Sequence, residues 1–465
     1  MVHSDKYYHT LECNVQCAIY NKKGDKLERK NYRPVSILSP ISKVLEKIVY
    51  EQMYSYFTRN HLLHPNLHGY RSNRSTQTAL LQMYDRWVRA SHEGKLSGVV
   101  LLDLSAAFDL VDPGLLLRKL KIYGFDDHIL EWLESYLSQR YQAVWIDNSL
   151  SSFLHCPVGV PQGSNLGPLL FLVFYNDLPY TVSCPVDVYA DDSTMTVSAN
   201  TIDEIGTHLT EACNVVSSWM VDNRLKVNPE KTHLLTVGTE RRLRQQESQV
   251  QVSMDRVQLQ ESAQSSELLL GVFIEPSLKW HRQIREVLKK LQLRLCALEK
   301  LKHSLPTSQK KIIVEGLFSS VLGHCLPVFG GCDKIELDAL QIMQNKAARI
   351  ITNFGLRTNR HELFKKIGWL TVRQLVYFYS AVCTFRIRLK QEPEYLYQIM
   401  NRNNRFEKII VPNSRLSLAI NSYCFRGARQ WNMLPDDIRS CTKINKFKSL
   451  LKSWVKANVP QFGED

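Results

Sequence analysis

The chain has 465 residues, 44% of them hydrophobic, which suits two or three globular domains and excludes a disordered chain. Its formal net charge of +14 comes from residues 281–465, which contain 32 Lys and Arg and 14 Asp and Glu. Residues 1–280 contain 27 Lys and Arg and 31 Asp and Glu. No run of about 18 apolar residues and no apolar signal core occur, so we expect an intracellular protein without a membrane partner, in nucleus or cytoplasm. The eleven cysteines form no CxxC pair, which argues against a disulfide framework and a zinc ribbon.

The first predicted element is a helix. Residues 1–30 show no clear period, and no structure is predicted for them. From Pro40 to Phe57 apolar residues recur at helical spacing, which predicts an amphipathic helix. The residues of its apolar face are Ile41, Val44, Leu45, Ile48, Met53 and Phe57.

Two segments are predicted to carry carboxylates at strand ends. Gly98–Leu104 is short, apolar and entered by glycine, which predicts a buried strand that delivers Asp103. Val186–Tyr189 and Thr194–Val197 are typical of the two strands of a hairpin, so Asp191 and Asp192 are expected at its turn. Acidic residues at a turn are usually only solvated, and the third carboxylate in a matching setting is what favours a site.

Helices and strands alternate through the rest of the first 280 residues, which suits an α+β domain. The expected elements are a helix capped by Asp126 or Asp127 and ending near Gln139, a strand at Ala143–Ile146, a helix at 202–222, strands at Lys226–Asn228 and His233–Val237, and a loop or hairpin tip at 239–266. Beyond Trp280 the strand signal fades. Helices are predicted at about 282–303, 308–322, 335–352 and 371–390, and a basic helix at Phe447–Val455.

Asp103, Asp191 and Asp192 would meet if their strands lie side by side in one sheet. Three such carboxylates make a divalent-cation site, because Mg²⁺ prefers a few oxygen ligands together with waters and substrate phosphates. Two ions about 4 Å apart can activate an attacking hydroxyl and neutralise a leaving pyrophosphate. The pattern therefore predicts nucleotidyl transfer with two Mg²⁺ ions as cofactors, for which Mn²⁺ is an acceptable substitute.

Seven short motifs follow one another along the chain. They are Asn31–Ser36, His68–Arg71 with Arg74–Thr76, Leu102–Asp109, Gly159–Ser164 continuing through Leu166–Phe171, the YADD tetrapeptide Tyr189–Asp192, Asn228–Thr232, and Leu270–Val272 with Leu278 and Trp280. In this order they resemble two finger motifs, palm motifs A to D and the primer grip of the reverse transcriptases of non-LTR (LINE-type, jockey-like) retrotransposons. The resemblance runs from Lys22 to about Val455, and seven ordered matches leave a negligible role for chance.

The resemblance implies a right-hand polymerase fold of the α+β class. Residues 1–30 would be an N-terminal remnant or linker, 31–280 fingers and palm with an antiparallel sheet, 281–400 a basic helical thumb or connection, and 401–465 a C-terminal basic region. The implied activity is that of an RNA-directed DNA polymerase, which adds dNTPs to the 3′-hydroxyl of a DNA primer on an RNA template. The basic last two fifths would grip these nucleic acids, or would be a solvated surface. The sequence assigns no oligomeric state.

Roles at the acidic site follow from the resemblance. Asp103 and Asp191 would bridge the metal ions, and Asp192 would complete the acidic cluster. Phe108 would lie under the incoming sugar and exclude a 2′-hydroxyl, and core packing is its other credible role. Lys231 would donate a proton to the leaving pyrophosphate, or would be a solvated lysine after a turn.

The remaining candidates concern substrate binding. Gln162 and Gly163 lie in a Gly/Pro-rich bend, where backbone can approach the nascent base pair closely. Arg33 and Arg71 are candidates for the triphosphate and the template backbone, since a guanidinium binds phosphate oxygens bidentately. Either could instead be a surface arginine. For Asp109 two roles are equally open, a structural hydrogen bond and a catalytic role.

Two departures from the family give rise to a rival interpretation. Full elements usually carry an endonuclease domain ahead of the polymerase, and only about 30 residues precede the first motif here, so a truncated copy is expected. Ala106 stands where many relatives have lysine, which leaves the acidic site untouched. The rival is a catalytically silent remnant that only binds nucleic acid. A group II intron maturase or a telomerase-like enzyme would use the same palm chemistry, but Trp431–Pro435 favours the retrotransposon type.

Overall fold

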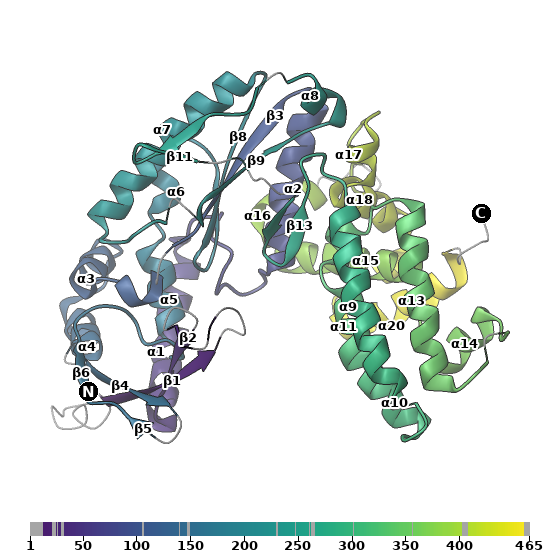
Figure 1. Cartoon of the computed structure of the whole chain (residues 1–465), viewed down its shortest axis with the longest axis horizontal. Helices are drawn as coiled ribbons and strands as arrows, with labels where there is room; N and C mark the ends of the chain where they lie inside the picture. Colours follow the sequence, from purple (N-terminus) through teal and green to yellow (C-terminus); the bar gives the residue numbers. More distant parts are fainter. Residues whose placement is uncertain are drawn as a thin grey trace.

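The computed structural model describes residues 13–20, 25, 27–28, 32–104, 107–138, 140–146, 149–228, 231–246, 248–259, 261, 266–300, 302–355, 357–401 and 408–459. The molecule has two lobes (Figure 1). A mixed lobe of sheets and helices is formed by the chain up to about residue 280, and a helical lobe by the rest. The fold is therefore of the predicted α+β class. Within the described residues, no helix is both long and apolar enough to cross a bilayer.

The central sheet of the mixed lobe has four antiparallel strands in the order β7–β8–β3–β9. Their bounds are Leu96–Leu102 for β3, Val186–Tyr189 for β7, Asp192–Ala199 for β8 and His233–Val237 for β9. Successive residues of a strand face opposite sides of the sheet. Accordingly, Gly98 lies against α7 (Ile202–Asp222), whereas Val99 packs in the same core as α2 (Thr76–His92). The two helices thus cover opposite faces of the sheet.

A second sheet of five short strands lies at the far end of the mixed lobe. It contains β1 (Cys13–Tyr20), β2 (Tyr32–Ile37), β4 (Arg140–Ile146), β5 (Ser149–Leu150) and β6 (Leu154–Cys156). The strand β1 falls in the region for which no structure was predicted. It pairs antiparallel with β2 and parallel with β4, which is distant in the sequence.

Further helical elements of this lobe are α1 (Pro40–Arg59), the 3₁₀ turn η2 (Ala107–Leu110), α3 (Pro113–Ile122), α4 (Asp127–Leu137), α5 (Gly167–Phe174) and α6 (Leu178–Thr181). Of these, α1 and α4 were predicted and begin and end near the predicted bounds, but α1 buries only part of its predicted apolar face. In α1 Met53 and Phe57 are buried as predicted. The predicted apolar residues Ile41, Val44 and Ile48 are exposed, while Glu46 is buried. Its carboxylate accepts hydrogen bonds from Asn165 N and the Tyr136 hydroxyl, which the period of the helix alone does not reveal.

Two hairpins and one short helix connect the central sheet to the helical lobe. They are α8 (Glu240–Arg244), β10–β11 (Val252–Met254 and Val257–Leu259) and β12–β13 (Glu267–Leu269 and Val272–Ile274). The segment 239–266, predicted as a loop or hairpin tip, therefore contains both a helix and a hairpin.

The helical lobe is built around the long helix α15 (Val372–Lys390). Its other elements are α9 (His281–Glu299), α10 (Thr307–Val314), the π-helix η4 (Glu315–Ser319), α11 (Ser320–Gly323), α12 (Leu326–Phe329), α13 (Lys334–Thr352), α14 (Arg360–Ile367), α16 (Glu394–Met400), α17 (Ser417–Asn421), α18 (Tyr423–Asn432), α19 (Asp436–Arg439) and α20 (Ile444–Asn458). Both α18 and α20 pack along α15. The rings of Phe385 and Phe447 stack with centroids 4.1 Å apart, so the C-terminal residues complete the core of this lobe.

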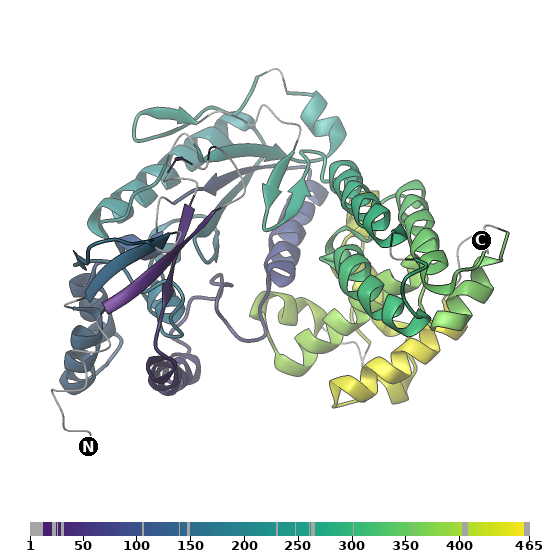
Figure 2. The ribbon, with the colours of Figure 1, turned by 60° about the horizontal axis from the view of Figure 1, so that its bottom comes forward.

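The helix α2 joins the two lobes, and Figure 2 shows it between them. One side packs on the central sheet, where Trp87 Nε1 donates to Thr196 Oγ1. The other side meets α12, α16, α17 and α18. There the Tyr395 hydroxyl donates to Asp85 Oδ2 at 2.7 Å. The central sheet and the helical lobe therefore rest on the same helix.

Candidate active site

The three predicted carboxylates lie at one end of the central sheet. Asp191 and Asp192 are at the turn between β7 and β8, and Asp103 follows the last residue of β3. The antiparallel register pairs Leu102 with Ser193, which brings Asp103 level with Asp192. The predicted adjacency of the two strands is confirmed.

The carboxylates influence one another electrostatically. Burial, and then the negative charges of Asp191 and Asp103, raise the pKa of Asp192 to about 6. Their ligand oxygens do not all lie within 4.8 Å of one another, so binding of one ion by all three requires side-chain rotation. Carboxylate oxygens that concentrate negative charge in this way are a donor set that suits Mg²⁺.

Lys231 lies beside the acidic group. Its Nζ is 3.7 Å from Asp103 Oδ2, and both side chains are partly exposed. Backbone hydrogen bonds hold this arrangement, since Asn228 N donates to Asp103 O and Lys231 N to Asn228 O. The lysine is thus placed next to the carboxylates by the segment that follows the predicted turn.

Phe108 packs mainly in the core. Its side chain is 8% exposed and stacks on Phe171 with ring centroids 4.4 Å apart. Tyr70 meets Phe108 edge-on at 6.0 Å and is 39% exposed. Tyr70 is therefore the more accessible ring of this pair, and no role was predicted for it. Its left-handed backbone, with φ of +55°, is the kind of local feature that often marks a site but is invisible in sequence.

The bend at Gln162 and Gly163 contacts two other predicted segments. Gln162 Nε2 donates to Asp109 Oδ1 at 2.9 Å, so Asp109 makes the structural hydrogen bond that was one of its two assignments. Gln162 O accepts from Ser36 N of β2. Gly163 has φ of +106°, and a Cβ there would lie 3.0 Å from Ser36 O, so both backbone conformation and space require glycine.

Arg140 supports the same bend and was missed from the sequence. It is almost fully buried, and its Nη2 donates to the carbonyl oxygens of Val158 and Gly159. An arginine at the start of a strand gives no signal of this role, because the acceptors are backbone carbonyls of a distant loop.

The segment Asn66–Gly69 lies along β7, next to the turn that carries Asp191 and Asp192. His68 N donates to Val188 O at 2.7 Å and Val188 N to Asn66 O at 2.9 Å, so the segment pairs with the free edge of β7. Unpaired strand edges need such cover. The acidic side chains consequently stand on a turn that is supported from outside the sheet.

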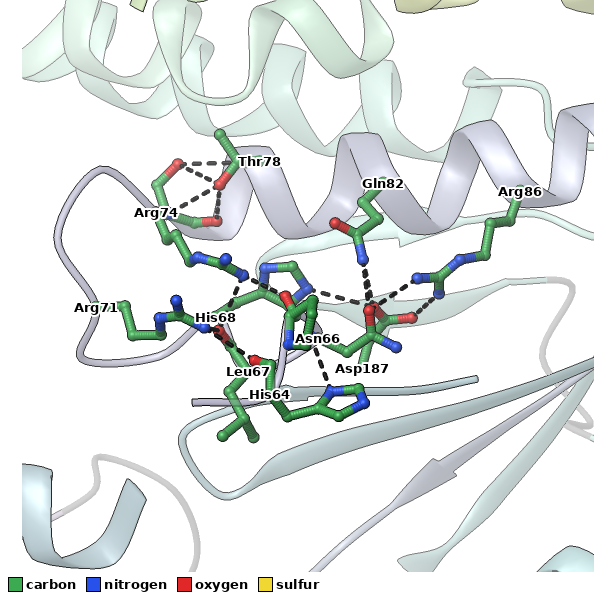
Figure 3. A network of polar contacts seen from close by, with 12 residues as sticks. His64, Asn66, Leu67, His68, Arg71, Arg74, Thr78, Gln82, Arg86 and Asp187 are labelled. Carbon is green, nitrogen blue, oxygen red and sulfur yellow. Dashed lines mark hydrogen bonds and ion pairs between the residues drawn. The ribbon is translucent and has the colours of Figure 1, made fainter. Parts of the chain in front are cut away.

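A buried ionic network holds this segment, as Figure 3 shows. Asp187 of β7 accepts hydrogen bonds from Arg86 and Gln82 of α2 and faces His68 Nε2 at 3.3 Å. Burial would raise the pKa of Asp187, but the Arg86 guanidinium and His68 hold it below its usual value. Burial lowers the pKa of His68, so its ring is neutral at pH 7 and presents Nε2–H to the carboxylate.

Arg71 takes part in this support and is not a surface arginine. Its Nη1 donates to the carbonyl oxygens of His64 and Leu67, and Figure 3 shows it turned toward them. Its Nη2 is 4.0 Å from Glu392, at the junction of α15 and α16. The guanidinium would have to give up these contacts to reach a phosphate. The side chain of Arg33 lies outside the described part of the chain, although its backbone is in β2.

Another group of potential ligands has a structural explanation. His281, Asp333 and Glu336 bring their ligand atoms within 4.8 Å of one another. Asp333 and Glu336, however, form the capping box that begins α13, and His281 Nδ1 pairs with Glu336 at 2.7 Å. The helix cap and the ion pair therefore account for the acidic side chains of this group.

Residues 20–272 match the family model described as reverse transcriptase (RNA-dependent DNA polymerase). The chain is 26% identical over 373 residues to the probable RNA-directed DNA polymerase from transposon BS of Drosophila melanogaster, covering 77% of the chain and 40% of the relative. It is 25% identical over 334 residues to the RNA-directed DNA polymerase from mobile element jockey of the same species, covering 69% and 36%. The chain thus spans about two fifths of the length of these relatives. Apo telomerase from Candida tropicalis is a similar solved structure, at 9% identity and a TM-score of 0.45, covering 98% of this chain and 70% of its own.

Proposed function

Because the chain belongs to the reverse transcriptase (RNA-dependent DNA polymerase) family, we propose that it is an RNA-directed DNA polymerase of the non-LTR retrotransposon type. Its partners are then an RNA template, a DNA primer and dNTPs, which occur inside the cell, so an intracellular location is part of the proposal. The observation that carries it is the placement of Asp103 beside Asp191 and Asp192 at one end of the central sheet. Residues 31–280 are assigned to fingers and palm, 281–400 to a thumb and 401–465 to a C-terminal basic region.

Asp103, Asp191 and Asp192 are the residues that would hold two Mg²⁺ ions, or Mn²⁺ in their place. When bound, such ions activate the primer hydroxyl and neutralise the charge that develops on the leaving group. The protein groups then contribute positioning and charge rather than covalent chemistry. The raised pKa of Asp192 fits this assignment, because a cation would replace the proton that the crowded carboxylates otherwise favour.

In the proposed reaction the primer 3′-hydroxyl loses its proton to water, and its oxygen forms a bond to the α-phosphorus of the dNTP. The bond from that phosphorus to the bridging oxygen breaks, and pyrophosphate leaves. Lys231 would give a proton to the leaving group, and the position of its ammonium beside Asp103 supports this role. Phe108 limits the space under the sugar, and the Gln162–Gly163 bend approaches the base pair. Arg33 and Arg71 remain candidates for phosphate contacts, and for Arg71 this requires release of its carbonyl partners.

Primer extension by the purified protein tests the proposal. We expect dNTP incorporation on poly(rA)/oligo(dT) that requires Mg²⁺, is supported by Mn²⁺ and is lost in Asp191→Asn. The matched control is Asp222→Asn, the same chemical change at the exposed end of α7, which should extend like the unmodified protein. Extension that survives Asp191→Asn would contradict the assignment.

The rival function, a silent protein that only binds nucleic acid, has a distinct signature. It predicts binding with a steep salt dependence and no incorporation under any metal condition. The carboxylates, the Gln162–Gly163 bend and Lys231 are all present, and these groups favour the polymerase over the rival.

A further inference from the structure

Two buried arginines of the mixed lobe share one carboxylate of the helical lobe. The side chains of Arg71 and Arg74 are only 10% and 2% exposed. Glu392 Oε1 lies 4.0 Å from Arg71 Nη2, and Glu392 Oε2 lies 3.7 Å from Arg74 Nε. Among the residues that the structure describes, no other acidic side chain forms an ion pair with either arginine. Two positive charges are therefore held inside the protein by one negative charge.

Glu392 offsets the cost of burying both guanidinium groups. Burial, and then the positive charge of Arg71, lower the pKa of Arg74 to about 10, while Glu392 acts to raise it. Burial also lowers the pKa of Arg71, and the charge of Glu392 is the main influence in the opposite direction. Both groups stay protonated at pH 7. If Glu392 lost its charge, they would repel each other without a counter-charge, which favours turning one of them out into water.

The same arginines hold the segment that supports the acidic turn. Arg71 Nη1 donates to His64 O at 2.9 Å and to Leu67 O at 3.3 Å. Arg74 Nη1 donates to Pro65 O and Leu67 O. These carbonyls lie in the stretch that pairs with the free edge of β7. An arginine that left its place would release two of them and loosen the stretch.

The three-residue corner between α15 and α16 brings Glu392 to this place. Just beyond the corner, the centroid of the Tyr395 ring lies 5.4 Å from the Arg86 guanidinium, and Arg86 pairs with Asp187 of β7. Figure 3 shows Arg86 at the end of the polar network opposite the two buried arginines. The helical lobe therefore contacts both ends of the support of the turn through one corner.

We propose that Glu392 is a positioning residue, which fixes the acidic turn from the helical lobe through Arg71 and Arg74. Contacts run from Glu392 to the two guanidinium groups, from these to the carbonyls of residues 64–67, and from that stretch to β7, which ends at the turn. The docking of the helical lobe on the mixed lobe and the placement of the three carboxylates are thereby coupled. This inference goes beyond the proposed function and rests on it only where primer extension is measured.

The test removes the charge of Glu392 and keeps the size of the side chain. The variant is Glu392→Gln, and the matched control is Glu394→Gln, the same change at an exposed position in the first turn of α16. Glu394 accepts a hydrogen bond from Gln398 Nε2, which a glutamine oxygen can also accept. Glu392→Asp keeps the charge with a shorter reach and should fall between Glu392→Gln and the unmodified protein in every measurement. Thermal melts show whether each variant is folded at the assay temperature, and Glu392→Asp carries the comparison if the glutamine variant is not.

Methyl NMR of the metal-free protein gives a readout that does not depend on catalysis. Leu67 and Val188 are paired in the bridge between the supporting stretch and β7. We expect Glu392→Gln to shift the methyl signals of both residues. The signals of β9, at the opposite edge of the sheet, and of α13 should stay in place. Glu394→Gln should leave all of these signals unchanged.

Primer extension and nucleic-acid binding give the second readout. Glu392→Gln should lower kcat about tenfold and raise the Mg²⁺ concentration for half-maximal rate at least about threefold, because small displacements of catalytic groups are costly. Its affinity for primer–template, measured by fluorescence anisotropy, should stay within about twofold, since the displaced carboxylates would hold metal and not nucleic acid. In the Arg71→Gln/Arg74→Gln background, Glu392→Gln should have no further effect, because the path to the turn is already absent.

The proposal is overturned by unchanged Val188 signals in Glu392→Gln, by equal shifts throughout both lobes, or by an unchanged Mg²⁺ requirement in an active protein. Equal effects of Glu394→Gln, or a further full loss in the double-arginine background, would overturn it as well. An unmodified protein that incorporates no dNTP would contradict the proposed polymerase, and the methyl signals would still decide the role of Glu392.

Discussion

Gly69 packs directly against the backbone of Ala190. A Cβ placed on Gly69 would lie 2.4 Å from Ala190 N, closer than side chains approach a backbone nitrogen. Ala190 has φ of +58°, a strained conformation for a residue with a side chain. Gly69 therefore determines how near the supporting segment can come to the turn that carries Asp191.

We predict that Gly69→Ala displaces this turn. The variant should extend primers at least about tenfold more slowly and need more Mg²⁺ for half-maximal rate, since small displacements of catalytic groups are costly. Its affinity for primer–template should stay within about twofold, because the displaced groups hold metal rather than nucleic acid. Steady-state extension titrated with Mg²⁺ measures the first effect and anisotropy the second.

The control is Gly355→Ala, since a Cβ there meets nothing within 4 Å and its φ is not positive. It should behave like the unmodified protein. Unchanged Mg²⁺ dependence in Gly69→Ala, with normal thermal stability, would show that the close approach does not set the metal site.

A second prediction separates the two roles of Phe108. Phe108→Leu keeps most of the packing volume and should cost less than about 1.5 kcal/mol of folding stability, but it alters the wall under the sugar. We expect the incorporation of rNTP relative to dNTP to rise several-fold. Competition between the two nucleotides in single-step extension measures this ratio.

The stacked partner provides a control for the same chemistry. Phe171→Leu changes an adjoining ring that is 1% exposed, so it should lower stability to a similar degree without affecting nucleotide choice. Equal changes in discrimination for both variants would assign Phe108 to packing alone.

Local signals in the sequence were enough to predict several elements. The helix α7 was predicted at its observed bounds, and the structure shows that a capping box of Thr201 and Glu204 begins it. The hairpin that carries Asp191 was also predicted, and its pairing with the strand before Asp103, which was the condition for a metal site, is present.

What the sequence did not reveal depends on contacts between distant residues. The strand β1 gains its second partner from β4, and no local period announces a parallel pairing of that kind. Glu46 is buried because Asn165 N and the Tyr136 hydroxyl donate to it. Arg71 is held by nearby carbonyls and by Glu392 from the helical lobe. In each case partners outside the segment itself, most of them far along the chain, decide the outcome.

A third prediction concerns the buried pair of Asp187 and Arg86, whose side chains are 1% and 17% exposed. Asp187→Asn leaves the guanidinium without its counter-charge inside the protein. Loss of one member of a buried pair typically costs about 3–5 kcal/mol, so we expect a fall of that size in the free energy of unfolding. Urea denaturation at neutral pH measures it.

Asp127→Asn is the matched change at an exposed pair, where Asp127 lies 2.9 Å from Lys121 and the two side chains are 75% and 66% exposed. Solvent screens this pair, so its loss should cost less than about 1 kcal/mol. Similar costs for the two variants would mean that the network around Asp187 does not depend on its charge.

The last prediction follows from the pKa of Asp192, which is raised from 3.8 to about 6 by burial and by Asp191 and Asp103. A carboxyl with a raised pKa in the folded state favours folding most when protonated, and this contribution is lost as the pH rises through 6. In EDTA at about pH 7, Asp192→Asn should therefore be more stable than the unmodified protein, by about 1 kcal/mol after allowance for solvent exposure. Near pH 4 the difference should vanish.

Mg²⁺ should stabilise the unmodified protein at pH 7 far more than at pH 5, where protons compete for the carboxylates, and should stabilise the variant less. Thermal melts across this pH range measure both effects, with Asp222→Asn as control. If Asp192→Asn is less stable than the unmodified protein in EDTA at pH 7, the crowding of negative charge at this turn is contradicted.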